Sequence, residues 1–371
     1  YRKIIFIPEE GQYIMIRVLV VDDSAFMRNM ITKFLTSNHE IAVAGTARNG
    51  EEALQKIKEL RPDVITLDIE MPVMNGKETL KRIMASDPLP VVMVSSLTQQ
   101  GADITIECLE LGAIDFVAKP SGSISIDLYK VRDMLIEKVL TAGRVKLKGR
   151  QVPISKPAIE TAKQPIVGGS DSVRFRAGKQ LICIGTSTGG PRALQRVLPK
   201  LPKTLKAPVF IVQHMPKGFT ASLANRLNHL SEVTVKEAEN GERAKDGWVY
   251  IAPGGKNMAV GLEKGELVIT LDDRDTESRH KPSVDYLFQS LASLREFEKI
   301  AVIMTGMGSD GTEGVKGLLK HGSGTVIAEA AESSVVFGMP KSVINNGLAN
   351  DIKHVDEIAA AIMTYMKKER A

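Results

Sequence analysis

Two series of short apolar runs, separated by about forty residues that lack them, constrain the fold of this chain more than any other feature. In each series, stretches with apolar side chains at helical spacing lie between the runs, as at residues 51–60. The runs are continuous rather than alternating, which is typical of parallel strands buried on both faces. Repeated strand–helix units therefore predict two parallel sheets, each covered by helices on both faces.

The runs and the helical stretches locate the expected elements. The first series predicts strands at residues 18–21, 41–44, 64–67, 91–94 and 116–118, with a last helix at 127–140. The second predicts strands at 181–184, 209–212, 249–251, 267–271, 300–304 and 325–328, and helices at 191–198, 219–230, 284–294, 312–320 and 355–368. Gly254-Gly255 and Gly261 indicate a locally antiparallel insertion. We predict a (βα)5 unit followed by a doubly wound, mostly parallel three-layer αβα unit.

The domain organisation follows from the two series. We predict a first domain at residues 15–140, an interdomain linker at 141–180 and a second domain at 181–371. The linker mixes Lys, Arg, Pro, Gly and Ser without apolar periodicity. Met15 directly precedes the first strand, so we interpret residues 1–14 as a non-native or extension segment. This segment lacks the basic start and long apolar middle of a signal peptide.

The composition argues against several classes of protein. Hydrophobic residues make up 43% and charged residues 25% of the 371, as in soluble globular proteins. Two cysteines, Cys108 and Cys183, are too few for a disulfide framework, which favours a reducing compartment and a cytoplasmic location. No apolar run reaches the roughly 18–20 residues that cross a bilayer, so we expect no membrane insertion. Much of the basic excess lies in the predicted linker and does not indicate nucleic-acid binding. We expect a monomer.

Carboxylates gather at the carboxyl ends of the first set of strands. Asp22-Asp23 follows the first strand, Asp68 ends the third, Ser95-Ser96 the fourth and Lys119-Pro120 the fifth. These ends meet at one sheet edge, where three carboxylates repel one another unless a hard cation, Mg²⁺ or Mn²⁺, neutralises them. Asp68 is the best candidate for a nucleophile that forms an aspartyl phosphate, with Lys119 and a serine hydroxyl contacting the phosphoryl oxygens. Alternatively, Asp22-Asp23 caps the next helix and Asp68 lies in a polar loop.

These residues resemble the motifs of a response-regulator receiver domain over roughly residues 15–140. The matching segments are Val20-Val21-Asp22-Asp23-Ser24, Leu67-Asp68-Ile69-Glu70-Met71-Pro72 with Gly76, Val94-Ser95-Ser96, and Ala113 through Lys119-Pro120. The resemblance implies a flavodoxin-like strand order 2-1-3-4-5 and phosphorylation of Asp68 by a histidine kinase. It also implies that Ser95 moves toward the phosphate and that the ring of Phe116 turns inward.

The second domain opens with a nucleophile motif. A predicted strand runs into Gly185-Thr186-Ser187-Thr188-Gly189-Gly190-Pro191, which matches G-x-S-x-G between a strand and a helix. The glycines permit a sharp turn that exposes the Ser187 hydroxyl, and the helix N-terminus favours a developing oxyanion. The same turn could instead hold a phosphate group through its backbone amides.

A nucleophilic serine needs a base and a carboxylate that orients the base. Among the six histidines, His214 follows a buried-type strand, which places it at the same sheet edge as Ser187. His280 is set aside because the cations on either side of it disfavour its charged form. Segment 305–311 follows another strand and contains one carboxylate, Asp310, which could alternatively cap the helix at 312–320. The order Ser–His–Asp differs from that of α/β-hydrolases, so membership of that fold is not implied.

Together these segments resemble the chemotaxis protein-glutamate methylesterases, and with the receiver motifs the resemblance covers essentially everything from Met15 onward. In the second domain it rests on segments 185–191, 213–216 with 218–220, 252–254, 279–285 and 305–311. It implies a triad of Ser187, His214 and Asp310, a backbone oxyanion donor at Met307, and no cofactor for ester hydrolysis. It implies γ-methyl glutamate esters on methyl-accepting chemotaxis receptors as substrates, with glutamine deamidation as a second activity. Thr186 stands where some members carry Ala.

Two other classes of protein also fit the receiver motifs. A DNA-binding response regulator would need a compact helix–turn–helix domain with a basic recognition helix, whereas about 190 residues of α/β pattern follow the linker. A phosphate-holding scaffold would use residues 185–190, which lack the GK[ST] ending of a P-loop and a complete G-x-G-x-x-G. In the esterase interpretation, the unphosphorylated receiver covers the cleft near Ser187, and phosphorylation of Asp68 favours an open arrangement.

Overall fold

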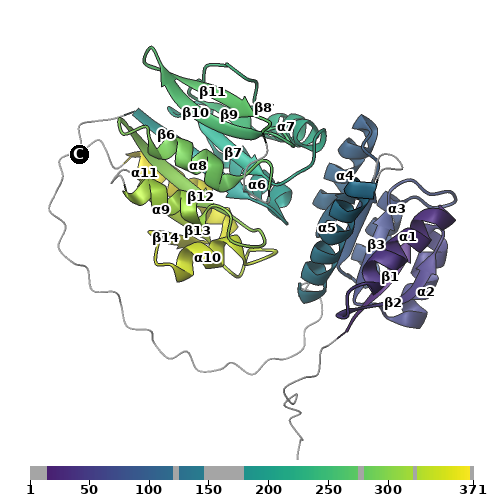
Figure 1. The fold of residues 1–371 in the computed structure, drawn as a ribbon. Coiled ribbons are helices and arrows are strands. Elements are labelled where there is room, and N and C mark those ends of the chain that lie inside the picture. Colours follow the sequence, from purple (N-terminus) through teal and green to yellow (C-terminus); the bar gives the residue numbers. More distant parts are fainter. Residues whose placement is uncertain (1–14, 120–124, 146–178, 275–279, 321–323, 368–371) are drawn as a thin grey trace, which may run out of the picture.

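The computed structural model describes residues 15–119, 125–145, 179–274, 280–320 and 324–367. This part of the chain consists mainly of two parallel sheets with helices on both faces, one N-terminal and one C-terminal (Figure 1). Residues 1–14, most of the predicted linker, and the motif residues Pro120 and Arg279 lie outside the described residues, so the domain bounds stay predictions. None of the described helices is long and apolar enough to cross a bilayer.

The N-terminal unit alternates strands and helices. Its described elements are β1 (Ile16–Val21), α1 (Ala25–Thr36), β2 (Ile41–Ala47), α2 (Gly50–Leu60), β3 (Val64–Asp68), α3 (Gly76–Ser86), β4 (Val91–Ser95), α4 (Gln99–Leu111), β5 (Asp115–Ala118) and α5 (Ser125–Arg144). All strand pairs are parallel in the order β2-β1-β3-β4-β5, which confirms the predicted flavodoxin-like fold. The helix α5 continues beyond its predicted end at residue 140 because Val139 and Ala142 extend its buried stripe.

Side-chain caps start four helices of this unit. The capping residues, each of which accepts a hydrogen bond from a backbone N–H of the first turn, are Ser24, Asn49, Asn75 and Thr98. Since Ser24 caps α1, the preceding Asp22-Asp23 pair is not used as the helix cap. Both aspartates therefore remain at the strand end.

The C-terminal unit is a larger parallel sheet with an added hairpin. Its described elements are β6 (Lys179–Thr186), α6 (Gly190–Val197), η1 (Leu198–Lys200), β7 (Val209–Gln213), α7 (Phe219–Leu230), β8 (Thr234–Glu237), β9 (Trp248–Ile251), β10 (Asn257–Glu263), β11 (Glu266–Asp272), α8 (Val284–Ala292), β12 (Phe297–Ile303), α9 (Thr312–Lys320), β13 (Gly324–Glu329), α10 (Met339–Asn345), β14 (Asp351–Lys353), η2 (Val355–Glu357) and α11 (Ile358–Lys367). The strand order is β14-β13-β12-β6-β7-β9-β8, with every pair parallel.

Alternate residues of the central strand build two apolar layers. In β6, Ile182 and Ile184 belong to the cluster that contains α6, α7 and α11, whereas Leu181 and Cys183 belong to the cluster that contains α8, α9 and α10. All four side chains are fully buried. This double burial explains the continuous apolar runs and confirms the three-layer αβα arrangement.

The predicted antiparallel insertion is the hairpin of β10 and β11. Its turn is Lys264-Gly265, where φ is 50° and 83°, as in a two-residue type I′ turn. The prediction of Gly261 as a turn residue is wrong, since Gly261 pairs with Val268 inside the hairpin. We predicted no strand at β10, because Gly261 indicated a turn there. The sequence also did not indicate β8, β14 or α10, which are only four, three and seven residues long. Elements this short leave no room for a periodic apolar pattern.

The two units pack together through α4. This helix lies beside α6 and α7 (Figure 1). Its Ile106 and Leu109 belong to the same buried apolar cluster as Leu194 of α6 and Leu223 of α7. The core of the N-terminal unit is therefore continuous with one apolar layer of the C-terminal unit.

Polar contacts accompany this apolar interface. The Arg226 guanidinium on α7 donates to both carboxylate oxygens of Glu110 on α4, at 2.7 and 2.9 Å. Gln195 of α6 donates to the same carboxylate at 2.7 Å. Gln99 at the start of α4 donates to the Ser222 hydroxyl of α7 at 2.8 Å. The interface is thus held by hydrogen bonds near both ends of α4.

Candidate functional site

Three loops of the C-terminal unit meet at one edge of its sheet. In the register of β6 with β7, Thr186 pairs with Gln213, so the next residues, Ser187 and His214, leave neighbouring strands side by side. The strand β12 pairs with β6 on its other side, and the Ser187 N–H donates to the Thr305 carbonyl at 3.0 Å. The carboxyl ends of these strands therefore bring together the segments that carry the predicted serine, histidine and aspartate.

Close backbone packing explains the glycines around Ser187. Gly189 has a φ of 80°, and a Cβ on Gly190 would lie 2.0 Å from Gln213 Oε1, which leaves no room for a side chain. The Gln213 amide donates to the Ser187 carbonyl at 3.0 Å. A Cβ on Gly306 would lie 2.8 Å from Ser187 Cβ, so the loop after β12 runs directly against the serine.

His214 and Asp310 form the hydrogen-bonded pair of the site. His214 Nε2 lies 2.8 Å from Asp310 Oδ2, and the two side chains are only 9% and 8% exposed. When Nε2–H donates to the carboxylate, the lone pair of the neutral ring is on Nδ1. Nδ1 is buried and has no hydrogen-bond partner in the described part of the chain. It is therefore the ring nitrogen that can accept a proton from a neighbouring hydroxyl.

Four donors hold the Asp310 carboxylate. Oδ2 accepts from His214 and from the Val284 N–H, each at 2.8 Å, while Oδ1 accepts from the Ser283 hydroxyl at 3.1 Å and the Asp285 N–H at 2.9 Å. Burial opposes ionisation, but the bond from His214 and the amides of α8 outweigh it and hold the pKa of Asp310 well below its usual range. Asp310 thus caps α8 rather than α9, the helix that follows it in sequence.

A second histidine covers one face of the imidazole. The His280 ring stacks on His214 with centroids 4.1 Å apart and planes 13° apart. His280 lies just before α8, so one short segment both stacks on His214 and binds Asp310. The sequence reading set His280 aside because of its flanking cations, and only the three-dimensional packing shows this contact.

Met307 follows the loop segment that touches the serine. The Thr305 N–H is bound by the buried Glu329 carboxylate at 2.8 Å, and the Gly306 N–H donates to the Val336 carbonyl at 3.0 Å. The Met307 N–H forms no hydrogen bond within the described residues. The two residues before Met307 are therefore fixed, while the Met307 N–H stays available.

The N-terminal unit contacts two of the three loops and the first residue of the helix that follows the third. The contacts are the Thr188 hydroxyl donating to Asp115, Met307 Sδ lying 2.7 Å from Thr141 Oγ1, and the rings of Phe219 and Phe116 with centroids 4.4 Å apart. Thr188 directly follows Ser187, and Phe219 begins the helix after the His214 loop. Sequence reasoning missed both residues: Asp115 lies within the receiver segment 113–120 but had no assigned role, and Thr141 lies in the predicted linker.

Asp22, Asp23 and Asp68 converge at the carboxyl edge of the first sheet. One oxygen of each lies within 4.8 Å of the others, with Asp22 and Asp68 buried and Asp23 exposed. Lys119 Nζ lies 2.7 Å from Asp68 Oδ2 and 3.2 Å from Asp22 Oδ2. Burial raises the pKa of Asp68 to about 6, although the hydrogen bond from Lys119 opposes this shift. Three carboxylates at this spacing fit a hard divalent cation.

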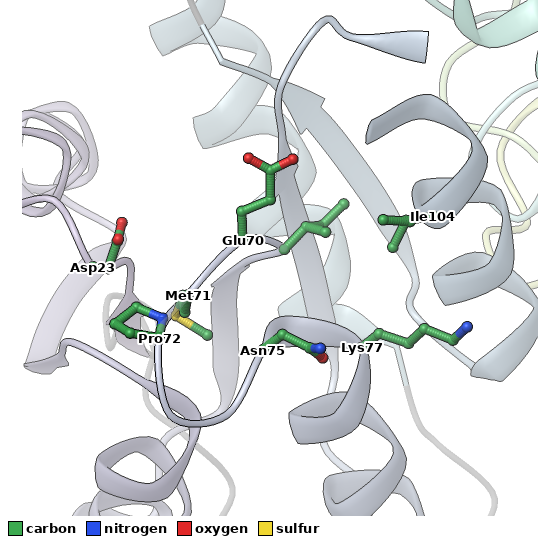
Figure 2. Close-up of a pocket in the computed structure, with 8 residues that line it drawn as sticks. Asp23, Glu70, Met71, Pro72, Asn75, Lys77 and Ile104 are labelled. Atoms are coloured by element: carbon green, nitrogen blue, oxygen red, sulfur yellow. The ribbon is translucent and has the colours of Figure 1, made fainter. Parts of the chain in front are cut away.

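An open pocket of about 710 Å³ lies beside this cluster, and Figure 2 shows the residues that line it. Asp23 and the loop after β3, including Glu70 and Pro72, line one part, while Lys77 and Ile104 line another. Since Asp23 is exposed, the carboxylate cluster can be reached from outside the protein.

Ser95 and Phe116 are both buried. The Ser95 hydroxyl accepts a hydrogen bond from Thr105 at 2.7 Å and donates to the Gly101 carbonyl at 3.2 Å. Phe116 packs against Phe219 of the other unit, so its ring lies in the interface. The movements predicted for these two side chains stay predictions.

Comparisons with known proteins match the two units separately. The response regulator receiver domain family matches residues 18–127, and the CheB methylesterase family matches residues 182–362. Together with the two sheets, these matches define a response regulator whose output domain is a methylesterase.

Curated relatives match nearly the whole chain. The protein-glutamate methylesterase/protein-glutamine glutaminase of Bacillus subtilis (strain 168) is 59% identical over 96% of this chain and 100% of its own. The protein of the same name from Geobacillus kaustophilus (strain HTA426) is 55% identical over 94% and 98%. The Thermotoga maritima CheB methylesterase catalytic domain, a crystal structure, is 46% identical with a TM-score of 0.49, and covers 51% of this chain and 100% of that chain. Because the two curated relatives match this chain over nearly their full length, this chain belongs to the protein-glutamate methylesterase/protein-glutamine glutaminase family.

Proposed function

We propose that this chain hydrolyses γ-methyl esters of glutamate on methyl-accepting chemotaxis receptors, and that phosphorylation of Asp68 activates it. Deamidation of receptor glutamines is a second reaction of the same site, since the amide and the ester give the same acyl-enzyme. The 2.8 Å contact between His214 and Asp310, at the strand edge where Ser187 stands, carries the proposal. The names of the relatives support the choice of substrate. We place this activity in a cytoplasmic monomer.

Ser187 is the nucleophile and His214 the general base. The serine oxygen attacks the ester carbonyl carbon while His214 Nδ1 takes its proton, and Asp310 stabilises the resulting imidazolium. The bond to the methoxy oxygen then breaks, and His214 returns the proton so that methanol leaves. A water molecule hydrolyses the acyl-enzyme by the same route and yields glutamate. The scheme needs no cofactor.

The Met307 N–H is the oxyanion donor in this scheme. It is available for a hydrogen bond, and it follows Gly306, which packs against Ser187. A fixed backbone donor stabilises the negative charge that develops on the carbonyl oxygen.

The first sheet carries the phosphorylation site in this proposal. Asp68 accepts the phosphoryl group from a chemotaxis histidine kinase. Asp22, Asp23 and Asp68 would hold a Mg²⁺ or Mn²⁺ ion, whose charge, when bound, reduces repulsion between the carboxylate and the incoming phosphoryl group. Lys119, already 2.7 Å from Asp68, and the Ser95 hydroxyl would then contact phosphoryl oxygens.

The receiver restrains the esterase until it is phosphorylated. Its contacts with Thr188, Met307 and Phe219 support this, because the first two lie on loops of the esterase site and Phe219 begins the helix after the His214 loop. Phosphorylation favours the open arrangement because the phosphoryl group interacts more favourably with the open state than with the closed state. An inward turn of the Phe116 ring would withdraw it from Phe219 and remove one contact of the closed state.

Methanol release from methylated receptor, with and without a small-molecule phosphodonor, tests the proposed function. The full chain should release methanol faster with the phosphodonor, and the same chain carrying Asp68→Asn should not respond. Equal rates with and without phosphodonor would contradict the regulatory part, and no methanol under either condition would contradict the activity.

Replacing Arg226 with alanine should raise the unphosphorylated rate several-fold. The substitution removes two hydrogen bonds across the interface, each contributing about 1 kcal/mol, and so weakens the closed state. The phosphorylated rate should stay unchanged, as measured by methanol release. Arg295→Ala removes an exposed arginine elsewhere in the domain and serves as the control. Inhibition by covering is wrong if Arg226→Ala, and also a fragment starting at residue 181, are no faster than the unphosphorylated full chain.

A further inference from the structure

We propose that Asp285 is a positioning residue of the esterase, whose carboxylate fixes the loop that presents Asp310 to His214. The inference rests on the proposed function and adds a residue to it. Asp285 lies in the first turn of α8, and its carboxylate forms no hydrogen bond with His214 in the described structure. Its action is therefore through the backbone that follows Asp310.

The Asp285 carboxylate binds the chain immediately after Asp310. Its Oδ1 accepts from the Gly311 N–H at 2.9 Å and from the Gly314 N–H at 2.6 Å. Gly311 is the next residue after Asp310, and Gly314 lies in the first turn of α9. One oxygen thus ties both ends of the short connection between the aspartate and its helix.

The two carboxylates bind the starts of each other's helices. Asp310 binds α8, the helix that carries Asp285, and Asp285 binds α9, the helix that follows Asp310. Asp310 accepts from the Val284 and Asp285 amides at the start of α8, while Asp285 accepts from amides at the start of α9. Carboxylates are favourable at helix N-termini because the unpaired N–H groups and the helix dipole both attract negative charge. These reciprocal hydrogen bonds hold α8, α9 and the Asp310 loop in one arrangement.

The backbone around Asp310 needs such an anchor. Gly308 and Gly311 flank it with φ of 78° and 96°, and glycine has more conformational freedom in the unanchored chain than any other residue. At Gly314 a Cβ would lie 2.6 Å from the Phe288 Cβ, so α8 and α9 approach too closely for a side chain there. Without the Asp285 oxygen, the chain after Asp310 would lose the two hydrogen bonds that hold Gly311 and Gly314.

The charge of Asp285 is consistent with this close pairing. Burial and the negative charge of Asp310 together raise the pKa of Asp285 to about 6, although the two glycine amides act in the opposite direction. Asp310 keeps its low pKa because His214 and the α8 amides bind it. The structure thus places two carboxylates side by side, with the catalytic candidate as the one that ionises first.

Asp285→Ala and Asp285→Asn separate positioning from simple structural support. The alanine variant should lower kcat about 10–100-fold with KM within about two-fold, because a displacement near 1 Å at a catalytic group costs rate on that order. The asparagine variant should recover kcat to within about five-fold, since its amide oxygen can accept the same two N–H bonds. Rates are measured on the phosphorylated full chain and divided by the folded fraction, read from the fluorescence of Trp248, the single tryptophan. Glu313→Ala, which removes an exposed carboxylate from the same turn of α9, is the control and should match the unsubstituted chain.

Three results overturn the proposal: an alanine variant with unchanged kcat, an asparagine variant as slow as the alanine variant, or a change confined to KM. The rate at which a fluorophosphonate reagent labels Ser187 gives a second comparison of the variants. If the unsubstituted chain released no methanol, the proposed function would fail, whereas the labelling rates would still test the role of Asp285.

The pH dependence of stability offers an independent expectation for Asp285. Its folded pKa of about 6 lies above the ordinary value of about 3.9, so the folded chain takes up a proton that the unfolded chain lacks between about pH 4 and 6. The stability that this group contributes is therefore lost as pH rises through that window. Asp285→Asn does not titrate, so its free energy of unfolding should rise relative to the unsubstituted chain from pH 4 to pH 7. Urea unfolding followed by Trp248 fluorescence measures this, and parallel curves would contradict it.

Discussion

Replacing Ser187 with alanine should reduce methanol release about 10⁴–10⁶-fold while leaving the fold unchanged. The hydroxyl oxygen is the only proposed nucleophile, and its removal leaves water to attack the ester without a covalent intermediate. The backbone at this position is held by the Thr305 carbonyl and the Gln213 amide, neither of which depends on the side chain. Steady-state methanol release from methylated receptor measures the loss, and circular dichroism checks the fold.

Ser309→Ala is the matched control for this substitution. Ser309 is exposed in the loop between Met307 and Asp310, and its hydroxyl forms no hydrogen bond with the described residues. This variant should keep full activity. If Ser187→Ala retained more than a few per cent of the rate, Ser187 would not be the nucleophile, and a large loss in Ser309→Ala would point to that serine instead.

Replacing Asp310 with asparagine should lower kcat about 10³–10⁴-fold, as loss of the orienting carboxylate does in other triads. Asp310 accepts four hydrogen bonds, including the one from His214 Nε2. An asparagine presents an NH₂ group in place of one carboxylate oxygen. The two donors that bind that oxygen would then meet another donor and lose their hydrogen bonds. If that group points toward Nε2, the ring must carry its proton on Nδ1, and the lone pair proposed to accept the Ser187 proton is lost.

The control for Asp310→Asn is Asp246→Asn, which removes an exposed carboxylate of the same domain that has no side-chain partner in the described structure. Burst-phase methanol release at several pH values separates the effect on acylation from that on product release. An Asp310→Asn enzyme with more than a tenth of the normal kcat would contradict the assigned role.

The sequence predicted the fold well where strands are long and buried on both faces. In an α/β chain, continuous apolar runs such as the core of β6 indicate parallel strands. The carboxyl ends of such strands meet at one edge of the sheet. That rule predicts neighbouring loops for Ser187, His214 and Asp310 from the sequence alone. Because Thr186 pairs with Gln213 in the register of β6 and β7, the residues that follow them leave neighbouring strands side by side.

Other features depended on packing that leaves no local signal. The sequence does not reveal which nitrogen of His214 faces Asp310, nor that Asp310 caps α8 instead of α9. The exchange between Asp285 and Asp310 joins residues 25 positions apart through the N-termini of two helices. Likewise, the contact between Thr188 and Asp115 depends on how two separately folded sheets meet.

The proposed esterase site requires that a hydroxyl, an imidazole and a carboxylate from three separate loops act as one nucleophilic group. Labelling of the full chain by a fluorophosphonate, mapped by peptide mass spectrometry with and without phosphodonor, tests this requirement. We expect one label per chain on Ser187, which forms faster with phosphodonor and at least 10³-fold more slowly in His214→Gln. A label on another residue, or one on Ser187 that forms equally fast without His214, would contradict it.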